Sequence, residues 1–356
     1  MANDDNENPK KDINSNEDLA KGPEEIVDSW DGLIAVYKYF KEQSEIKDKN
    51  GKRKFKFIFR GQGPHGNLKT SIEQAFDDFE IDINERPGLE KKLIRSFQRK
   101  APYHLKGVGV PALDDTLGWL SLMQHHGAPT RLLDWTYSFY RALYNAISES
   151  SHKCKLCGKF ESELWVMNTN WFTDETEGNL EKGITGILRD SIEDSSERTP
   201  EERQRKIELL AALNNAKKEK ADYRGNLANN RNKLVQYLMD LEEPLSLVYN
   251  MTPIGLNERV IYQQGTFVLP SDITKCFMQN LKLYGNDYKN HLYKIEINLV
   301  LWERNKIIED LNDMNINEAV LFPGLDGFAR SLKMQLAFTH KFGNVENPSK
   351  KKTKSK

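Results

Sequence analysis

The chain has 356 residues, of which 38% are hydrophobic and 29% are charged, so it is long enough to bury the core of one large domain or two ordinary ones. Its 52 basic residues are balanced by 53 acidic ones, which excludes a protein that bulk charge alone would bring to DNA or to a membrane surface. Contact with nucleic acid would therefore need a local basic patch.

The sequence carries no sign of a membrane or secretory protein. It contains no apolar run of the roughly eighteen residues that a membrane span needs. Its first 22 residues lack the apolar core of a signal peptide. The cysteines number three, an odd count that does not suit a disulfide framework and fits a reducing compartment. We therefore expect a cytoplasmic protein with no membrane partner.

Composition divides the chain into a central domain and two polar ends. Residues 1–24 and 346–356 are rich in charged and polar side chains and predict disordered tails, the second of them basic. Residues 25–345 alternate helix-like and strand-like segments, which predicts an α+β domain with a mixed or antiparallel sheet core flanked by helices. Residues 175–245 within it are highly charged, and we expect an inserted helical hairpin there.

The first half of the domain predicts helices around one aromatic strand. A first amphipathic helix is indicated by apolar residues at helical spacing, namely Ile26, Trp30, Ile34 and Tyr37. The alternation of Phe55, Phe57 and Phe59 with other residues predicts a strand with one aromatic face, followed by a glycine-rich loop. Further helices are expected over 71–99, from Asp114 or Asp115 to a C-cap glycine at Gly127, and over 136–150.

The second half predicts strands rich in β-branched and aromatic residues. They are expected over 163–168, 257–269 and 291–302. A last helix is expected over 307–316, ahead of the segment "NEAVLFPGLDGFARSLK".

The segment "LMQHHGAPTRLLDWT" at 122–136 is the chemically richest part of the chain. If it is extended after the helix, Arg131 and Asp134 lie on opposite faces of a strand. If it turns, the two can form an ion pair, which is the usual reason for burying either one. The histidines His125 and His126 are adjacent and so do not form the i, i+4 pair that binds one metal ion from a helix. Either one of them acts in catalysis or substrate binding, or both cap and pack the helix C-terminus.

A second polar group lies at the end of the aromatic strand. Arg60 is followed by Gly61 and Gln62, and glycine lets a ligand approach the backbone closely. An arginine in this place suits a phosphate or a carboxylate ligand. The alternative is that Arg60 pairs with a carboxylate of the protein and locks the loop.

A metal site receives little support from the sequence. The segment "HKCKLCGKF" offers Cys154 and Cys157 with the spacing of a zinc knuckle, but a tetrahedral site needs four ligands. Only Cys276 or His291 could complete it, from far along the chain. We therefore predict no metal site. The motifs of P-loop NTPases, zincins and serine hydrolases are also absent from the sequence.

Four segments in the same order resemble the FRG domain, named for its Phe-Arg-Gly. They are "FIFRGQ" at 57–62, "LMQHHGAPTRLLDWT" at 122–136, "NERVIYQQGTFVL" at 257–269 and "VLFPGLDGFARSL" at 320–332. The resemblance spans residues 26–335 and departs from the family after Thr136, where the helix "YSFYRALYNAI" is bulkier. It implies a bacterial intracellular toxin or an antiphage effector.

The Phe-Arg-Gly strand is in turn similar to the arginine-bearing strand of the Arg-Ser-Glu group of ADP-ribosyltransferases. This likeness implies NAD as a substrate, with the "PTRLLDW" segment lining the nicotinamide pocket and "YQQGTF" forming the third catalytic strand. The residues that it implies to contact NAD are Arg60, Gly61, Gln62, Thr130, Arg131, Trp135 and Gln264.

The chemistry of those transferases also needs a carboxylate near the cationic ribose. The "QQG" strand offers the neutral amides Gln263 and Gln264 where a glutamate would be expected, so Asp134 or Glu258 would have to supply the charge, with His125 or His126 orienting the ribose.

Three hypotheses remain open. The chain is an enzyme that transfers ADP-ribose from NAD or hydrolyses NAD. Alternatively, it is a non-catalytic module that binds a nucleotide, a nucleic acid or a protein, with residues 175–245 docking an antitoxin or another partner. In the third, buried polar residues only specify packing.

Overall fold

The computed structural model describes residues 23–64, 66–105, 110–149, 158–179, 182, 204, 235–236, 238–240, 244–252 and 258–339. Both predicted tails lie almost wholly outside these ranges, as does most of the predicted hairpin at 175–245. The cysteines of the zinc-knuckle motif, Cys154 and Cys157, also lie outside them. The predicted domain limits, 25–345, stay a prediction.

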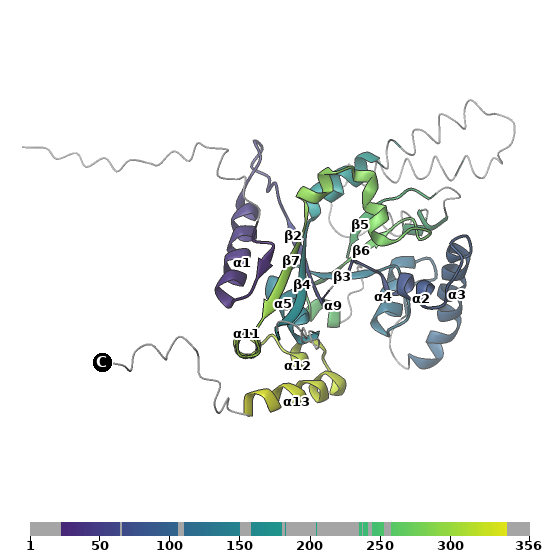
Figure 1. Ribbon diagram of the computed structural model, residues 1–356. Coiled ribbons are helices and arrows are strands. Elements are labelled where there is room, and N and C mark those ends of the chain that lie inside the picture. The colour runs from purple at the N-terminus through teal and green to yellow at the C-terminus, as the bar shows by residue number, and fades with distance from the viewer. Residues whose placement is uncertain are drawn as a thin grey trace, which may run out of the picture.

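Within the described residues, seven strands form one mixed sheet in the order β1-β7-β4-β2-β3-β6-β5 (Figure 1). Strand β1 pairs with β7 in parallel, and every other neighbouring pair is antiparallel. The predicted α+β class with a mixed sheet core is therefore confirmed. The strands are β1 Ile26–Val27, β2 Phe57–Gln62, β3 Leu133–Thr136, β4 Phe160–Asn168, β5 Val248–Met251, β6 Gly265–Pro270 and β7 Leu292–Leu299.

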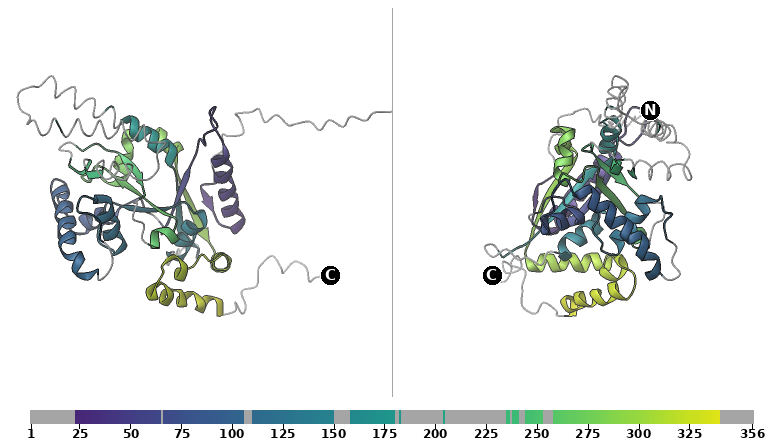
Figure 2. Two further views of the ribbon diagram at one scale, coloured as in Figure 1. Left: turned by 180° about the vertical axis from the view of Figure 1, so that it is seen from behind. Right: turned by 90° about the vertical axis from the view of Figure 1, so that its right-hand side faces the viewer.

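Helices flank the sheet on both sides. Figures 1 and 2 show α1 on one side of the sheet and α2, α3 and α4 on the other, with α12 and α13 along one end. No described helix is long and apolar enough to cross a membrane. The helices are α1 Trp30–Glu45, α2 Ser71–Asp78, α3 Arg86–His104, α4 Thr116–His125, α5 Phe139–Glu149, α9 Glu258–Tyr262, α10 Phe277–Asn280, α11 Leu301–Asp313, α12 Glu318–Leu321 and α13 Leu325–Thr339.

The alternation of residues along β2 divides the core into two clusters. Phe57 and Phe59 are buried in the cluster that includes α1 and α5, whereas Ile58 is buried in the cluster that includes α4, β3 and β6. Because side chains of a strand alternate between its faces, this is the aromatic face predicted from the sequence. Phe55 lies just before the strand and stacks on Phe57.

Gly61 lets β2 lie directly against helix α5. A Cβ atom at this position would stand 1.8 Å from the backbone oxygen of Ala142 and 2.5 Å from the backbone nitrogen of Ala146. Backbone atoms of a helix do not give way as a flexible side chain does. The structure thus shows a packing reason for this glycine.

We predict that Gly61→Ala lowers the free energy of unfolding by about 1–3 kcal/mol, the usual cost of overpacking a core. Urea denaturation measures the change. Gly63→Ala is the matched control, because a Cβ at Gly63 meets nothing within 4 Å, and we expect a much smaller loss for it. Equal stability of the two variants would contradict the close approach of β2 to α5.

The structure corrects three predicted elements. The first helix begins only at Trp30, because the Ser29 side chain caps it and Ile26 belongs to β1. The predicted helix over 71–99 is two helices, α2 and α3, since the chain turns between them with a positive φ of 51° at Glu80. The start of the predicted strand over 257–269 is instead the short helix α9.

Candidate functional site

Helix α4 begins and ends with the caps expected from its sequence. The Asp115 side chain accepts a hydrogen bond from the backbone of Gly118, which confirms Asp115 as the N-cap. At the other end, Gly127 has a φ of 75° and donates to Gln124 O, and Ala128 donates to Met123 O. This pair of hydrogen bonds is a Schellman motif. It sets the direction in which the chain leaves α4 toward β3.

We predict that Gly127→Ala destabilises the fold by about 1 kcal/mol, because a Cβ disfavours the left-handed conformation. Gly88→Ala is the control. Gly88 lies in α3 with open space around it, and alanine there favours the helix by up to about 1 kcal/mol. Thermal unfolding of the two variants should therefore shift in opposite directions, and a shift in the same direction would refute this role of Gly127.

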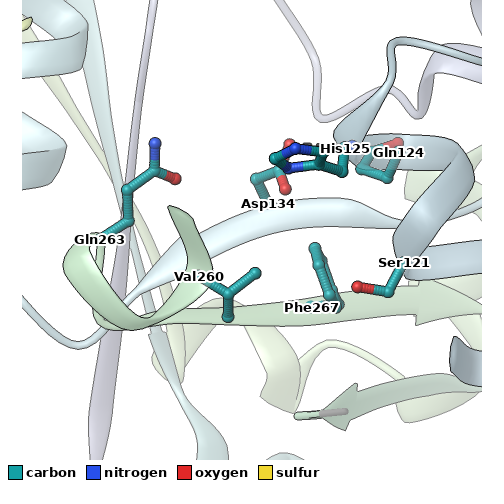
Figure 3. A pocket seen from close by; sticks show the side chains of 7 residues that line it. All are labelled: Ser121, Gln124, His125, Asp134, Val260, Gln263 and Phe267. Carbon is teal, nitrogen blue, oxygen red and sulfur yellow. Dashed lines mark hydrogen bonds between the residues drawn. The ribbon is translucent and has the colours of Figure 1, made fainter. Parts of the chain in front are cut away.

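A pocket lies between α4, β3, β6 and α9 (Figure 3). It has about 270 Å³ of empty space, a volume that includes space open to solvent. Figure 3 shows the His125 ring beside the Asp134 carboxylate, with Gln263 on the opposite side of the pocket. The lining residues are Ser121, Gln124, His125, Asp134, Val260, Gln263 and Phe267.

Asp134 reaches the pocket because of its position in the sheet. It is the register partner of Phe267 on β6, so the two side chains share a face of the sheet. Its side chain is exposed, whereas Leu133 and Trp135 on either side of it are buried in the core. The pocket therefore holds a carboxylate that faces solvent and lies next to an aromatic ring.

Gln124 orients the carboxylate of Asp134. Its Nε2 donates to Asp134 Oδ2 over 2.8 Å, and its Oε1 accepts from the hydroxyl of Thr130 over 2.6 Å. Because an amide has one donor side and one acceptor side, the Thr130 hydroxyl fixes which way the Gln124 amide points. Thr130 is fully buried and also accepts a hydrogen bond from Leu132 N, so this relay is rigid.

The two adjacent histidines have different surroundings. His125 is half-buried and lines the pocket, whereas His126 is exposed and is the C-cap residue of α4. Their rings meet edge to face with centroids 4.9 Å apart. Of the two, His125 alone is in a position to contact a ligand in this pocket.

Arg60 holds the backbone of Asp134 in place. Strands β2 and β3 share a single register pair in the described chain, Phe59 with Thr136, and diverge beyond it. Arg60 Nη1 bridges the gap and donates to the backbone oxygen of Asp134 over 2.8 Å. The side chain of Gln62 points to the same face as Arg60, and its Nε2 donates to Gly66 O and to the buried carboxylate of Glu163.

Tyr137 and Lys56 hold the two strands together on the other side of this register pair. The Lys56 ammonium lies over the Tyr137 ring, 4.7 Å from its centroid. Burial alone would raise the pKa of the Tyr137 hydroxyl, but Lys56 and hydrogen bonds from neighbouring polar side chains lower the pKa below its ordinary value. The charge of Lys56 thus stabilises the contact of β2 with the end of β3.

Arg131 takes part in the core and not in the pocket. It is buried and forms a bidentate ion pair with the equally buried Glu90 of α3, and its Nη1 donates to Pro270 O and Ser271 O. Of the two arrangements that the sequence left open, the structure has Arg131 and Asp134 apart. Trp135 is likewise buried in the core.

The segment before β6 contributes one side chain to the pocket. Gln263 lines it and donates to Leu321 O over 3.2 Å. Gln264 is exposed with a φ of 47°, and its backbone oxygen accepts from Tyr137 N. Both precede β6, which starts at Gly265. Glu258 is the first residue of α9, and its side chain lies outside the described part of the structure.

The family model of the FRG domain matches residues 55–155, from the start of the aromatic strand to just beyond α5. The chain contains an FRG domain. No curated protein and no solved structure matches it. The matched segment supplies Arg60, helix α4 and Asp134, whereas α9 and β6 add the other wall of the pocket from outside it.

Five residues that line the pocket were not among the predicted site residues, namely Ser121, Gln124, Val260, Gln263 and Phe267. Ser121 could have been found, because Ser121, Gln124 and His125 follow the i, i+3, i+4 spacing of one helix face. Val260 and Phe267 carry no such signal, since only the register of β3 with β6 and the position of α9 bring them to Asp134. In the described part of the chain, no group of three or more metal-ligating side chains is gathered.

Proposed function

We propose that this FRG domain protein is an enzyme that cleaves the bond between nicotinamide and ribose in NAD, and either hydrolyses NAD or transfers ADP-ribose to a macromolecule. The observation that carries the proposal is the Asp134 carboxylate, which faces the open pocket beside His125 and is held in one orientation by Gln124. Oriented charge of this kind is what a reaction with a cationic transition state needs.

The proposed chemistry follows from how the bond breaks. Nicotinamide leaves with the electron pair of the glycosidic bond and becomes neutral, and positive charge develops on the ribose. Asp134 stabilises that charge, and water or an acceptor group of the target then bonds to the ribose carbon and loses a proton. We assign this role to Asp134 and not to Glu258, because Asp134 lines the pocket together with His125.

The other lining residues have supporting roles in this proposal. His125 orients the ribose hydroxyls, and Phe267 packs against the nicotinamide ring. Arg60 acts as a positioning residue through the Asp134 backbone, and its contact with NAD phosphate stays a prediction. The same holds for the NAD contacts assigned to Gly61, Gln62, Thr130, Arg131, Trp135 and Gln264.

The resemblance to FRG proteins also suggests a setting for this activity. We propose a toxin or antiphage role in the cytoplasm of a bacterium, where consumption of NAD would stop metabolism. Such a toxin would need a cognate antitoxin, for which we propose residues 175–245 as the docking segment. Growth of cells that express the chain, with and without the candidate partner, tests this setting.

The test of the enzyme is an NAD consumption assay on the purified chain, with and without cell lysate. It follows nicotinamide release and the transfer of labelled ADP-ribose to protein or nucleic acid. We expect release by the wild-type chain and its loss in Arg60→Ala. Absence of turnover by a folded wild-type chain would refute the enzyme.

A second candidate is a module that binds a nucleotide without turnover. The neutral amide of Gln263 favours it, because this side chain lines the pocket in the segment where the transferase likeness implies a glutamate. This candidate predicts that NAD or nicotinamide riboside raises the melting temperature of the chain in the absence of nicotinamide release.

A further inference from the structure

Residues 46–54, between α1 and β2, form a hairpin with one isolated antiparallel bridge, which we call the basic ribbon. Lys47 faces Arg53 across an antiparallel bridge. Backbone hydrogen bonds of 2.8 Å join Lys54 N to Ile46 O and Asp48 N to Lys52 O. Figure 1 shows this segment projecting beyond the end of α1, away from the helices that cover the sheet. Its side chains are therefore available to a partner.

The basic ribbon concentrates positive charge on a chain whose net charge is only -1. Its one acidic residue is Asp48, whose carboxylate accepts hydrogen bonds from Asn50 N and Lys52 N, each over 2.9 Å. No cation of the ribbon forms an ion pair with a residue that the structure describes. The exposed cations are Lys47, Lys49, Lys52, Arg53 and Lys54.

Local stability does not account for this arrangement. Lys47 and Arg53 are direct cross-strand partners, and like charges placed opposite one another destabilise a pair of strands. The same positive charges attract a polyanion that lies alongside them. Lys54 lies over the Phe55 ring, 5.3 Å from its centroid, and Asn170 donates to Arg53 O, but neither contact brings a negative charge to the Lys47–Arg53 pair. A local rule that is broken in this way points to a function outside the fold.

The distribution of cations over both faces of the ribbon indicates which polyanion it binds. Because partners that face each other share a side, Lys47 and Arg53 lie on one face. Lys52 and Lys54 lie on the other face, together with Asp48. The major groove of B-DNA, about 12 Å wide, admits a two-stranded β-ribbon and has a phosphate backbone along each wall. A membrane surface would engage one face alone, and the major groove of A-form RNA is too narrow for a ribbon.

We infer that the basic ribbon binds duplex DNA by entering the major groove, with its cations on the phosphates of both walls. This inference goes beyond the proposed NAD chemistry and does not depend on it, since no residue of the ribbon lines the pocket. DNA would be either a docking platform or a nearby target for the chain.

The test is the binding of the full chain to a fluorescein-labelled 20-base-pair duplex, followed by anisotropy at several salt concentrations. Each phosphate contact contributes about 0.9 to the slope of log K against log salt. We expect the triple variant K52Q/R53Q/K54Q to reduce that slope by about 2–3 and the affinity at least tenfold. The matched control is K92Q/R95Q/R99Q, which removes three exposed cations of α3 and should change the affinity less than twofold.

Three results would overturn the inference. They are no binding of the duplex by the wild-type chain, equal losses in the two triple variants, and tighter binding to phosphatidylserine vesicles or to double-stranded RNA than to DNA. The single variant Lys52→Gln, with an expected slope change of about 0.9, covers the case in which the triple variant fails to fold. NAD consumption is measured on the same samples, so that loss of DNA binding and loss of catalysis are told apart.

Discussion

Asp134→Asn should reduce the rate of NAD consumption about 100- to 1,000-fold and leave the fold intact. The substitution removes the negative charge but keeps the shape, and the amide oxygen of asparagine can still accept the hydrogen bond from Gln124 Nε2. Loss of one preoriented group that stabilises transition-state charge typically costs about 2.7–4 kcal/mol of activation free energy, which corresponds to this factor. Nicotinamide release under saturating NAD measures the rate.

The matched control for this variant is Asp78→Asn. Asp78 is also an exposed aspartate that accepts a hydrogen bond from a glutamine side chain, Gln74 of α2, but it does not line the pocket. We expect the wild-type rate for the control and the same melting temperature for both variants. A wild-type rate in Asp134→Asn would show that Asp134 is not the carboxylate of the reaction.

Arg131→Met should lower the free energy of unfolding by about 3–5 kcal/mol, the largest stability loss that we expect from a single substitution. It leaves the Glu90 carboxylate buried without its cation, and breaking one partner of a buried pair typically costs this amount. It also removes the donor to Pro270 O and Ser271 O at the end of β6. Urea denaturation monitored by tryptophan fluorescence measures the change.

The double variant Arg131→Met/Glu90→Leu separates the two contributions. Replacing both members of a buried pair by apolar residues is often nearly neutral, so the double variant should regain part of the stability that the single variant loses. The remaining loss reflects the hydrogen bonds from Arg131 to Pro270 O and Ser271 O, which the double variant does not restore. A free energy of unfolding of the single variant within about 1 kcal/mol of wild type would contradict this structural role of Arg131.

The sequence by itself determined the local structure of this protein, meaning its helix caps and the faces of its strands. The caps of α4 at Asp115 and Gly127 follow from hydrogen bonds between residues three to five positions apart, and the aromatic face of β2 follows from its alternation. The FRG resemblance was readable for the same reason at residues 55–155, which are continuous in the chain, whereas the segments at 257–269 and 320–332 lie outside the family match. The α+β class follows from such local patterns summed along the chain.

The tertiary structure alone decided how those segments meet. Arg131 pairs with Glu90, 41 residues away, and Gln62 bonds to Glu163, 101 residues away. Phe267 reaches Asp134 only through the register of β3 with β6. The choice between helix and strand at 258–262 was also non-local, since Val260 of α9 packs in the core. The partners against which a side chain is buried come from distant segments that the complete fold brings near. The spacing of residues within one segment therefore carries no information about those partners.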